Sequence, residues 1–431
     1  MKRQLPYGDG EYTIEIPDQK VNSILEGIPM NSLDNENAEV RRAMNNPVDS
    51  APLSQLVKNG EKVSIIVGDM TRLSVRHHVL LPPILDELNQ GGVPDNDILI
   101  ISATGDHREQ KPEEHRKLVG EDVYKRVKVI DHRAEVDEEL VSVGTTTYGN
   151  EVKINRNVVE ADRVVLTGGI AYHFLAGWGG GKKAILPGVS GYNTIMQNHT
   201  FALHPEPGKG INPEVRAGKV DGNPCSDDMV QGASMVGPDF LVNSVINEAD
   251  HKIALVTAGN YLTAFNKGCK FVDQHMSVRI KETAPLVIAS CGGYPKDINF
   301  YQTYKTIYHA HFALQKGGTM ILLSESREEI GNEDFASIFT DYDSNAEREA
   351  ALRRKYTIGG FMGYHSAIIA EDNNLLVLSD LDHELVRSMG MAPVSSLEEA
   401  LEIAASQHGG DLPRAYIMPH GGTTLPILSQ K

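Results

Sequence analysis

Two histidines in this 431-residue chain follow apolar, β-branched segments through short turns that contain glycine. His107 ends the sequence ATGDH after the segment 97–101, and His173 ends GGIAYH after the segment 163–166. An imidazole, with an ordinary pKa near 6.5, exchanges a proton at neutral pH with little tuning. The carboxyl ends of parallel strands share one edge of a sheet, so we expect both histidines in one crevice, as bases that face one substrate carbon. Taken separately, either could be a capping or hydrogen-bonded loop histidine.

A third strand end carries an acid and a guanidinium group. The sequence GDMTR follows the segment 62–67 and contains Asp69, Thr71 and Arg72. A guanidinium fork can hold a carboxylate or a phosphate through two hydrogen bonds. A plain surface ion pair between Asp69 and Arg72 is the alternative.

The most unusual segment is AGWGGGKKAILPG, residues 176–188, in which Gly179, Gly180 and Gly181 precede Lys182 and Lys183. Glycines expose backbone N–H groups, and beside two lysines this is typical of a phosphate or nucleotide site. The segment is not a Walker A loop, because alanine takes the place of the first glycine and Lys183 takes the place of the serine or threonine that binds magnesium. A flexible glycine-rich turn remains the alternative.

Other polar groups are ambiguous by themselves. His199 lies sixteen residues after Lys183, near the start of a helical pattern, where a structural histidine is the ordinary interpretation. Tyr301, Gln302 and Lys305 stand just before a predicted helix, and their polar ends could converge on an anion at its start. The 16 histidines include no HExxH or comparable zinc spacing.

The elements that must position these groups alternate between buried strands and helical patterns, which predicts an α/β fold with mainly parallel sheets. We expect two domains, 1–270 and 271–431, with the last strand able to return to the first domain. The predicted strands are 62–67, 97–101, 127–130, 163–166 and 252–256 in the first domain, and 285–289, 319–323, 375–378 and 415–418 after it.

Composition excludes several classes of protein. The net charge of −17 repels phosphate backbones and anionic lipid surfaces, so we expect no nucleic-acid partner and no membrane partner. The N-terminus has no apolar run typical of a signal peptide, and no later stretch approaches the roughly 20 apolar residues of a membrane span. Three widely spaced cysteines offer neither a disulfide framework nor a CxxC metal site. A cytoplasmic protein is expected.

Taken together, the segments GDMTR, ATGDH, GGIAYHFLAGWGGGKKAILPGVSGY, the Asn198-His199 pair and GGYPKDINFYQTYK resemble the nickel-pincer lactate racemase family. The resemblance covers almost the whole chain. It implies two α/β domains with the active site in the cleft between them. It also implies a nickel-bound pyridinium-3,5-bisthiocarboxylic acid mononucleotide, the nickel-pincer nucleotide, attached covalently to a lysine.

The resemblance also assigns roles. Lys183 matches the attachment point, with Lys182 as the alternative, and His199 matches the protein ligand to nickel. Two sulfurs, a pyridinium carbon and an imidazole nitrogen form a near-square-planar set that suits Ni(II). Arg72 and Lys305 match residues that hold the substrate, and Asp69 would orient Arg72 or the cofactor. The remaining cofactor-binding matches are Thr71, Gly179, Gly180, Gly181, Tyr301 and Gln302. Tyr301 and Gln302 would also hold substrate oxygens.

His107 and His173 match the acid/base pair of the family. The α-hydrogen of a 2-hydroxy acid is not acidic enough for a histidine to remove, so the resemblance implies a hydride route in which one histidine takes the hydroxyl proton and the other returns it. The expected function is a racemase or epimerase of 2-hydroxy acids, with lactate as the expected substrate and cofactor-assembly enzymes as partners. An epimerase of a longer 2-hydroxy or sugar acid, a non-catalytic carrier of nickel or cofactor, and a zinc hydrolase remain alternatives.

Overall fold

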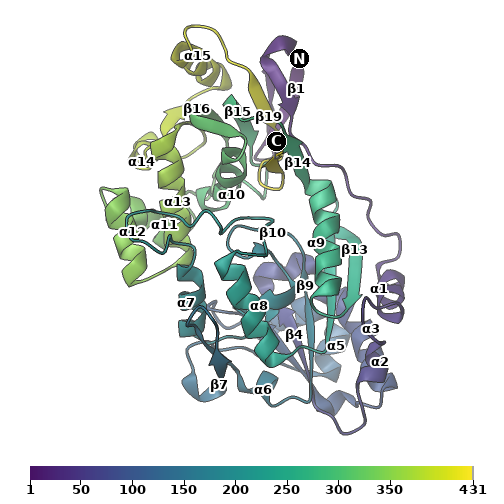
Figure 1. The fold of residues 1–431 in the computed structure, drawn as a ribbon. Coiled ribbons are helices and arrows are strands. Elements are labelled where there is room, and N and C mark those ends of the chain that lie inside the picture. The colour runs from purple at the N-terminus through teal and green to yellow at the C-terminus, as the bar shows by residue number, and fades with distance from the viewer. Residues whose placement is uncertain (430–431) are drawn as a thin grey trace. The chain divides into compact units, whose positions relative to one another are not determined.

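A computed structural model describes residues 1–429 of the chain (Figure 1). They form two compact units. The N-terminal unit comprises Pro29–Pro205 and Ile211–Asp273, and the C-terminal unit comprises Met1–Ile28, Glu206–Gly210 and the chain from Gln274 onward. Residues 430 and 431, the end of the predicted second domain, lie outside the described residues.

The N-terminal unit is built on a six-stranded sheet in the order β13-β12-β9-β4-β5-β6. Neighbouring strands are parallel except β12 and β13, which form an antiparallel pair at one edge. The strands are β4 (Val63–Gly68), β5 (Ile98–Ala103), β6 (Lys128–Asp131), β9 (Arg163–Gly169), β12 (Phe240–Asn247) and β13 (Lys252–Gly259).

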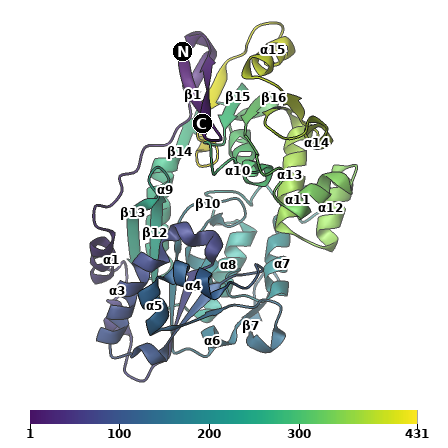
Figure 2. The ribbon, with the colours of Figure 1, turned by 180° about the vertical axis from the view of Figure 1, so that it is seen from behind.

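Alternating side chains of this sheet enter two separate cores. Ile65 and Val165 pack with one set of helices, and Ile66 and Leu166 pack with another. Each such fully buried aliphatic side chain contributes about 1.5–3 kcal/mol, so the helices fix the strands from both faces. The first set is α1 (Glu36–Asn45), α3 (His77–Gln90), α4 (Pro112–Val119) and α5 (Glu121–Arg126), of which α3 to α5 are seen in Figure 2; the second is α6 (Arg156–Val159), α8 (Pro224–Val236) and α9 (Thr263–Met276).

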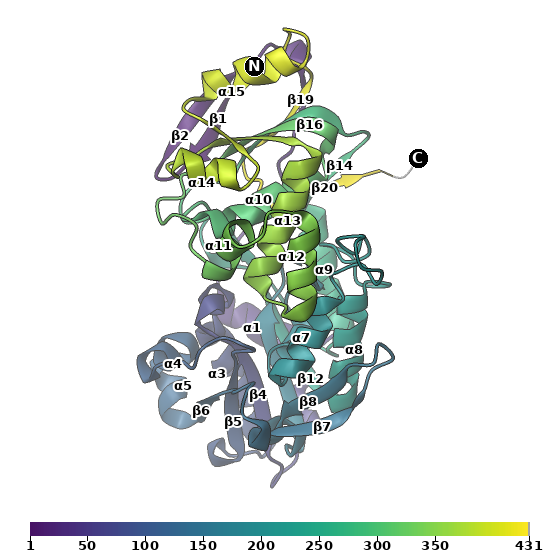
Figure 3. The same cartoon turned by 90° about the vertical axis from the view of Figure 1, so that its left-hand side faces the viewer.

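The C-terminal unit contains a second six-stranded sheet, in the order β18-β17-β16-β15-β19-β3, in which all neighbouring strands are parallel. A hairpin and α15 (Leu397–Gln407) cover one face, while α10 (Phe300–His311) and α13 (Ile358–Asp372) contact the strands from the other face (Figure 3). The strands are β3 (Val21–Ile24), β15 (Ala284–Ser290), β16 (Leu314–Leu323), β17 (Asn374–Leu378), β18 (Ala392–Val394) and β19 (Ala415–Met418), and the hairpin is β1 (Lys2–Tyr7) with β2 (Gly10–Glu15).

Shorter elements complete the two units. The helices are α2 (Leu53–Leu56), α7 (Tyr192–Thr200), α11 (Glu333–Thr340), α12 (Asn345–Arg354) and α14 (His383–Ser388). The strands are β7 (Leu140–Thr145), β8 (Glu151–Asn155), β10 (Tyr172–His173), β11 (Gly177–Trp178), β14 (Ser277–Ile280) and β20 (Leu425–Leu428).

The expected α/β fold with two mainly parallel sheets is confirmed, whereas the division of the chain differs from 1–270 and 271–431. Residues 1–28 are part of the C-terminal unit because β3 pairs with β19 and because Leu5 and Ile14 cover the apolar face of that sheet. β19 lies between β15 and β3, so the last predicted strand pairs with residues 21–24 of the predicted first domain, within the sheet of the C-terminal unit. None of the helices in residues 1–429 is long and apolar enough to cross a membrane.

Candidate active site

Three adjacent strands of the N-terminal sheet end at the candidate site. β4 lies between β9 and β5, and Gly68 at the end of β4 is paired with Ala103 at the end of β5. The segments that carry Asp69, His107 and His173 therefore leave the sheet at the same edge, as expected for a ligand site in an open parallel sheet. This strand order explains why residues far apart in the sequence come together here.

Asp69 holds His107 by a hydrogen bond. The Nδ1 atom of His107 lies 2.5 Å from Oδ2 of Asp69, while the backbone N–H and hydroxyl of Thr71 donate to Oδ1. Burial raises the pKa of Asp69, but the hydrogen bonds from His107 and Thr71 outweigh it and keep that pKa below its usual value. The same bond raises the pKa of His107. Because Nδ1 faces the carboxylate, Nε2 is the nitrogen left to exchange a proton with a substrate.

Arg72 is arranged differently from the expectation that Asp69 would orient it. Its Nη1 atom donates to the hydroxyl of Thr71 at 3.0 Å and to the carbonyl of Thr71 at 3.3 Å. Thr71 therefore lies between the guanidinium group and Asp69. The carboxylate bonds His107 directly, whereas it reaches Arg72 through Thr71 and through space, since the charge of Arg72 helps to lower the pKa of Asp69.

Asp69→Asn is expected to lower kcat by about 10²–10⁴-fold, the usual size of an acid/base contribution. The asparagine amide would donate to Nδ1 and place the ring proton on Nε2, the wrong nitrogen. Without the carboxylate the pKa of His107 also falls, so the residual activity in the direction that needs neutral His107 should extend to lower pH. Rates of turnover between pH 5 and 9 measure both effects. Asp106→Asn is the control, since Asp106 raises the pKa of His107 only through space; an equal loss in both variants would contradict a specific role for Asp69.

His173 is held by backbone groups rather than by a carboxylate. It lies in the two-residue strand β10, which pairs with β11 so that His173 faces Gly177, and stacking of Tyr172 on Trp178 at 4.4 Å supports the hairpin. Its Nδ1 accepts hydrogen bonds from the N–H groups of Leu175 and Ala176, at 3.1 and 3.3 Å. Burial has the largest effect in lowering its pKa well below the ordinary value, and the positive charge of Arg72 adds to it. The pKa values of the two histidines are therefore shifted in opposite directions.

The two lysines of the glycine-rich segment have different surroundings. The Nζ atom of Lys183 lies 2.9 Å from Nε2 of His173. The Nζ atom of Lys182, which is 2% exposed, donates to the carbonyl of Ala176 and lies 5.0 Å from the centre of the Phe265 ring. Burial lowers the pKa of Lys182 to about 8 and that of Lys183 to about 7. Of the two, Lys183 is the one in contact with a predicted catalytic histidine.

The glycines before these lysines are required by packing. A Cβ on Gly180 would lie 2.9 Å from the carbonyl oxygen of Gly169, and a Cβ on Gly181 would lie 2.6 Å from the Phe265 ring. Both have positive φ, +76° and +56°, which favours glycine. The N–H of Gly179 donates to the carbonyl of Ala171 at 2.8 Å. Close packing on β9 and α9 therefore explains this glycine run without a phosphate, and Gly179 N–H is already engaged.

His199 lies near the end of α7, not near the start of a helix as the sequence pattern indicated. Its Nδ1 is 3.1 Å from Oδ1 of Asn198, whose Nδ2 donates to Asp228 at 2.8 Å and to the carbonyl of Cys225 at 2.9 Å. Those two acceptors fix the orientation of the Asn198 amide, so Nδ1 of His199 must be the donor. Burial lowers the pKa of His199 to about 3, and the neutral ring therefore carries its lone pair on Nε2.

The sequence did not indicate a role for Asp228, because no motif or spacing distinguishes it from other acidic residues. It is fully buried on α8 and also accepts hydrogen bonds from Thr146 and Asn150. Its partners come from separate loops and helices, so only the tertiary structure reveals that it anchors Asn198 and thereby His199. Such partners commonly fix the orientation of a metal-binding histidine.

The donor set fits a metal that brings other ligands with it. Among residues 1–429 there is no group of three or more His, Cys, Asp or Glu side chains that could hold a metal ion. Neutral His199 offers one imidazole nitrogen, and the neighbouring Cys225 is fully buried, with the pKa of its thiol raised by burial, so it remains a thiol. A metal at His199 would need its further ligands from a bound cofactor, which is the arrangement of a pincer nucleotide.

Tyr301, Gln302 and Lys305 lie in the C-terminal unit, in the first turns of α10. The Nζ atom of Lys305 donates to Oε1 of Gln302 at 2.9 Å, so these two side chains share one face of the helix. The Tyr301 ring packs edge-on against Phe335. Gln302 and Lys305 therefore contact each other, and their binding of an anion and their part in the reaction stay predictions.

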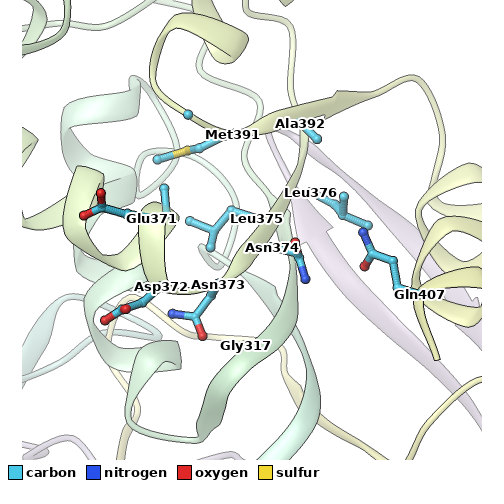
Figure 4. Close-up of a pocket in the computed structure, with 12 residues that line it drawn as sticks. Gly317, Glu371, Asp372, Asn373, Asn374, Leu375, Leu376, Met391, Ala392 and Gln407 are labelled. Atoms are coloured by element: carbon cyan, nitrogen blue, oxygen red, sulfur yellow. The ribbon is translucent and has the colours of Figure 1, made fainter. Parts of the chain in front are cut away.

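A hollow of about 380 Å³ lies elsewhere in the C-terminal unit (Figure 4). Its lining includes Asn374 and Ala392, at the amino ends of β17 and β18, together with Glu371 and Asp372. Ligands of parallel sheets bind at the carboxyl ends of strands, and this lining contains neither a histidine nor a basic side chain. The hollow is therefore not the site that the sequence predicts.

This fold and this site define an α/β protein with two histidines at neighbouring strand ends, His107 paired with a carboxylate and His173 beside a lysine. Residues 7–210 match the lactate racemase N-terminal domain and residues 280–425 match the lactate racemase C-terminal domain. The chain is 32% identical to the lactate racemase of Thermoanaerobacterium thermosaccharolyticum over 429 residues, 98% of each chain, and 31% identical to that of Lactiplantibacillus plantarum over 430 residues, 97% of each chain. The chain belongs to the lactate racemase family and is an isomerase of that family.

Two solved structures are similar to this protein. The apoprotein of the T. thermosaccharolyticum lactate racemase superposes with a TM-score of 0.89 at 30% identity, covering 99% of this chain and 100% of that one. A Thermotoga maritima protein gives a TM-score of 0.59 at 18% identity over 94% of this chain and 100% of that one, and shows likeness of fold alone.

Proposed function

We propose that the protein interconverts the enantiomers of a 2-hydroxy acid, with lactate as substrate, and uses a nickel-pincer nucleotide attached to Lys183. The observation that carries the proposal is the pair of contacts Asp69–His107 and His173–Lys183 at neighbouring strand ends. The names of the two relatives support lactate over a longer acid. The proposal includes a cytoplasmic location and dependence on enzymes that assemble the cofactor.

Two residues of the N-terminal unit would hold the cofactor. Lys183 would carry it covalently, and Nε2 of His199, oriented through Asn198 and Asp228, would bind the nickel. When bound, the cofactor supplies a hydride acceptor, which the side chains of the chain lack. Thr71, Gln302 and Tyr301 remain proposed contacts to it.

The chain itself supplies proton transfer and orientation. His107, with a raised pKa, and His173, with a lowered pKa, are suited to give and to take a proton at the same pH. One of them accepts the hydroxyl proton of a substrate enantiomer, and the other returns a proton to that oxygen when the opposite enantiomer forms. Arg72 and Lys305 would hold the substrate carboxylate, since guanidinium and ammonium groups donate hydrogen bonds to carboxylate oxygens.

The test is production of the protein with nickel and cofactor-assembly enzymes, followed by peptide mass spectrometry and an enantiomer assay. We expect an adduct on the Lys183 peptide and conversion of D- and L-lactate into one another. Faster conversion of gluconate-like acids than of lactate would favour an epimerase of longer acids. An adduct without any conversion, unaffected by His107→Ala, would favour a carrier, and racemisation without an adduct would contradict the cofactor.

A further inference from the structure

The contact between Lys183 and His173 fixes which of the two nitrogens carries a proton. The atoms concerned are Nζ of Lys183 and Nε2 of His173, 2.9 Å apart. Either nitrogen could donate in principle. The other ring nitrogen of His173 decides between the possibilities.

Nδ1 of His173 accepts hydrogen bonds from two backbone N–H groups, those of Leu175 at 3.1 Å and Ala176 at 3.3 Å. A backbone N–H can only donate, so Nδ1 carries no proton. A neutral imidazole has one N–H, which must therefore be on Nε2 while these two bonds are made. A protonated ring would point Nδ1–H at the two N–H groups, so His173 can take up a further proton only after these bonds break. Nε2–H then donates to Nζ of Lys183. An amine nitrogen accepts a hydrogen bond only when it is not an ammonium ion.

We propose that Lys183 in the cofactor-free protein is a neutral amine, held as the acceptor of a hydrogen bond from Nε2–H of His173, and that His173 positions it as a nucleophile for its own acylation. The protonation state concerns the polypeptide alone. Its use in attaching a cofactor rests on the proposed function. His173 is in this respect a positioning residue, in addition to its proposed part in proton transfer.

Lys182 shows the opposite arrangement and is the internal comparison. Its Nζ donates to a carbonyl oxygen at 3.3 Å and lies over the Phe265 ring at 5.0 Å. A carbonyl acceptor and the face of an aromatic ring both favour an ammonium ion. Two adjacent lysines are thus held in different forms, one as a cation and one as an amine.

The charges around Lys183 agree with this assignment. Burial has the largest effect in lowering its pKa to about 7, and the positive charges of Arg72 and Lys182 add to it. Asp106 and the Cys225 thiol act in the opposite direction. The rings of His173 and His199, the other titratable groups near Lys183, are both neutral because burial lowers their pKa.

Competitive acetylation of the cofactor-free full-length protein tests the proposal. Trace acetic anhydride at pH 7 acetylates neutral amines: the Nζ–C bond forms, the anhydride C–O bond breaks, acetate leaves and the amine proton passes to the buffer. About half of Lys183 would be neutral at this pH, against roughly one ordinary lysine in 2,500. After allowing for its partial burial and weaker basicity, we expect mass spectrometry to show Lys183 labelled at least about tenfold faster than exposed lysines such as Lys267.

Variants of His173 separate positioning from simple burial. His173→Ala removes the donor and admits water, which favours the ammonium form, so labelling of Lys183 relative to Lys267 should fall about fivefold. His173→Gln offers an amide N–H donor and should restore much of it. Labelling of Lys182 should change less than twofold in both variants, which also reports that the loop remains folded.

Nitrogen-15 NMR of the unaltered protein gives a second measurement that does not depend on any variant. We expect His173 with its proton on Nε2 and Nδ1 unprotonated. A proton on Nδ1, or labelling of Lys183 no faster than that of Lys267, would overturn the proposal. Neither measurement uses nickel, nucleotide or substrate, so fast labelling of Lys183 in a protein that never acquires an adduct would contradict the proposed function and leave this inference intact.

Discussion

Lys183→Arg is expected to lower racemisation to the uncatalysed background. Arginine stays charged and cannot be acylated under these conditions, so the variant would lose both the proposed attachment point and the proposed neutral amine beside His173. Because the hydride acceptor would be lost with the cofactor, the loss should exceed that of any single acid/base variant. Enantiomer conversion and the mass of the 176–188 peptide measure the two consequences together.

Lys182→Arg is the matched control for this result. Arginine preserves a cation over Phe265 and a donor to the carbonyl of Ala176, so we expect most of the activity and the adduct to remain. Lys267→Arg, on the exposed side of α9, should leave both unchanged. If Lys183→Arg kept its activity while Lys182→Arg lost it, the attachment point would have to be Lys182.

His107→Ala is expected to reduce kcat by about 10²–10⁴-fold in both directions. A racemase at equilibrium passes each enantiomer through both histidines, so loss of one slows both conversions. Because the His107 side chain is 43% exposed, added imidazole should reach the vacated space and restore part of the rate.

The pH dependence of the rate gives a second measurement of the role of His107. In the direction in which His107 accepts a proton, its ring must start neutral. Because the pKa of His107 is raised, the activity in this direction should rise with pH around a midpoint above the ordinary histidine pKa of about 6.5. Imidazole that rescues the variant lacks the full bond to Asp69, so the rise should move to lower pH. His78→Ala, a nearby exposed histidine on α3, should show neither effect. An unchanged kcat in His107→Ala would remove His107 from the reaction.

The strand ends were predictable because parallel strands follow a rule about where their loops meet. Nine apolar segments indicated nine observed strands, and the position of a loop after β4, β5 or β9 follows from the sheet alone. The partner of Asp69 was not predictable, since His107 and Arg72 both lie within reach of that strand end. The side-chain rotamers and the turn after Ala103 decide between them, and the spacing of residues in the sequence predicts neither.

β12 was missed for a related reason. Its sequence FLVNSVIN is interrupted by Asn243 and Ser244, which break the apolar run although both are buried in the structure. The strand sits beside β9 at the edge where the site lies. Polar residues inside a strand interrupt the run of apolar residues from which a strand is predicted. In β12 the interruption falls where the strand approaches the candidate site.

The pairing of β3 with β19 has a consequence for how the protein is made. β3 leaves the ribosome well before its neighbour β19. All six strands of the N-terminal sheet are synthesised between them. That sheet can therefore fold during translation, while β3 must wait, exposed to chaperones and proteases, until β19 has been made.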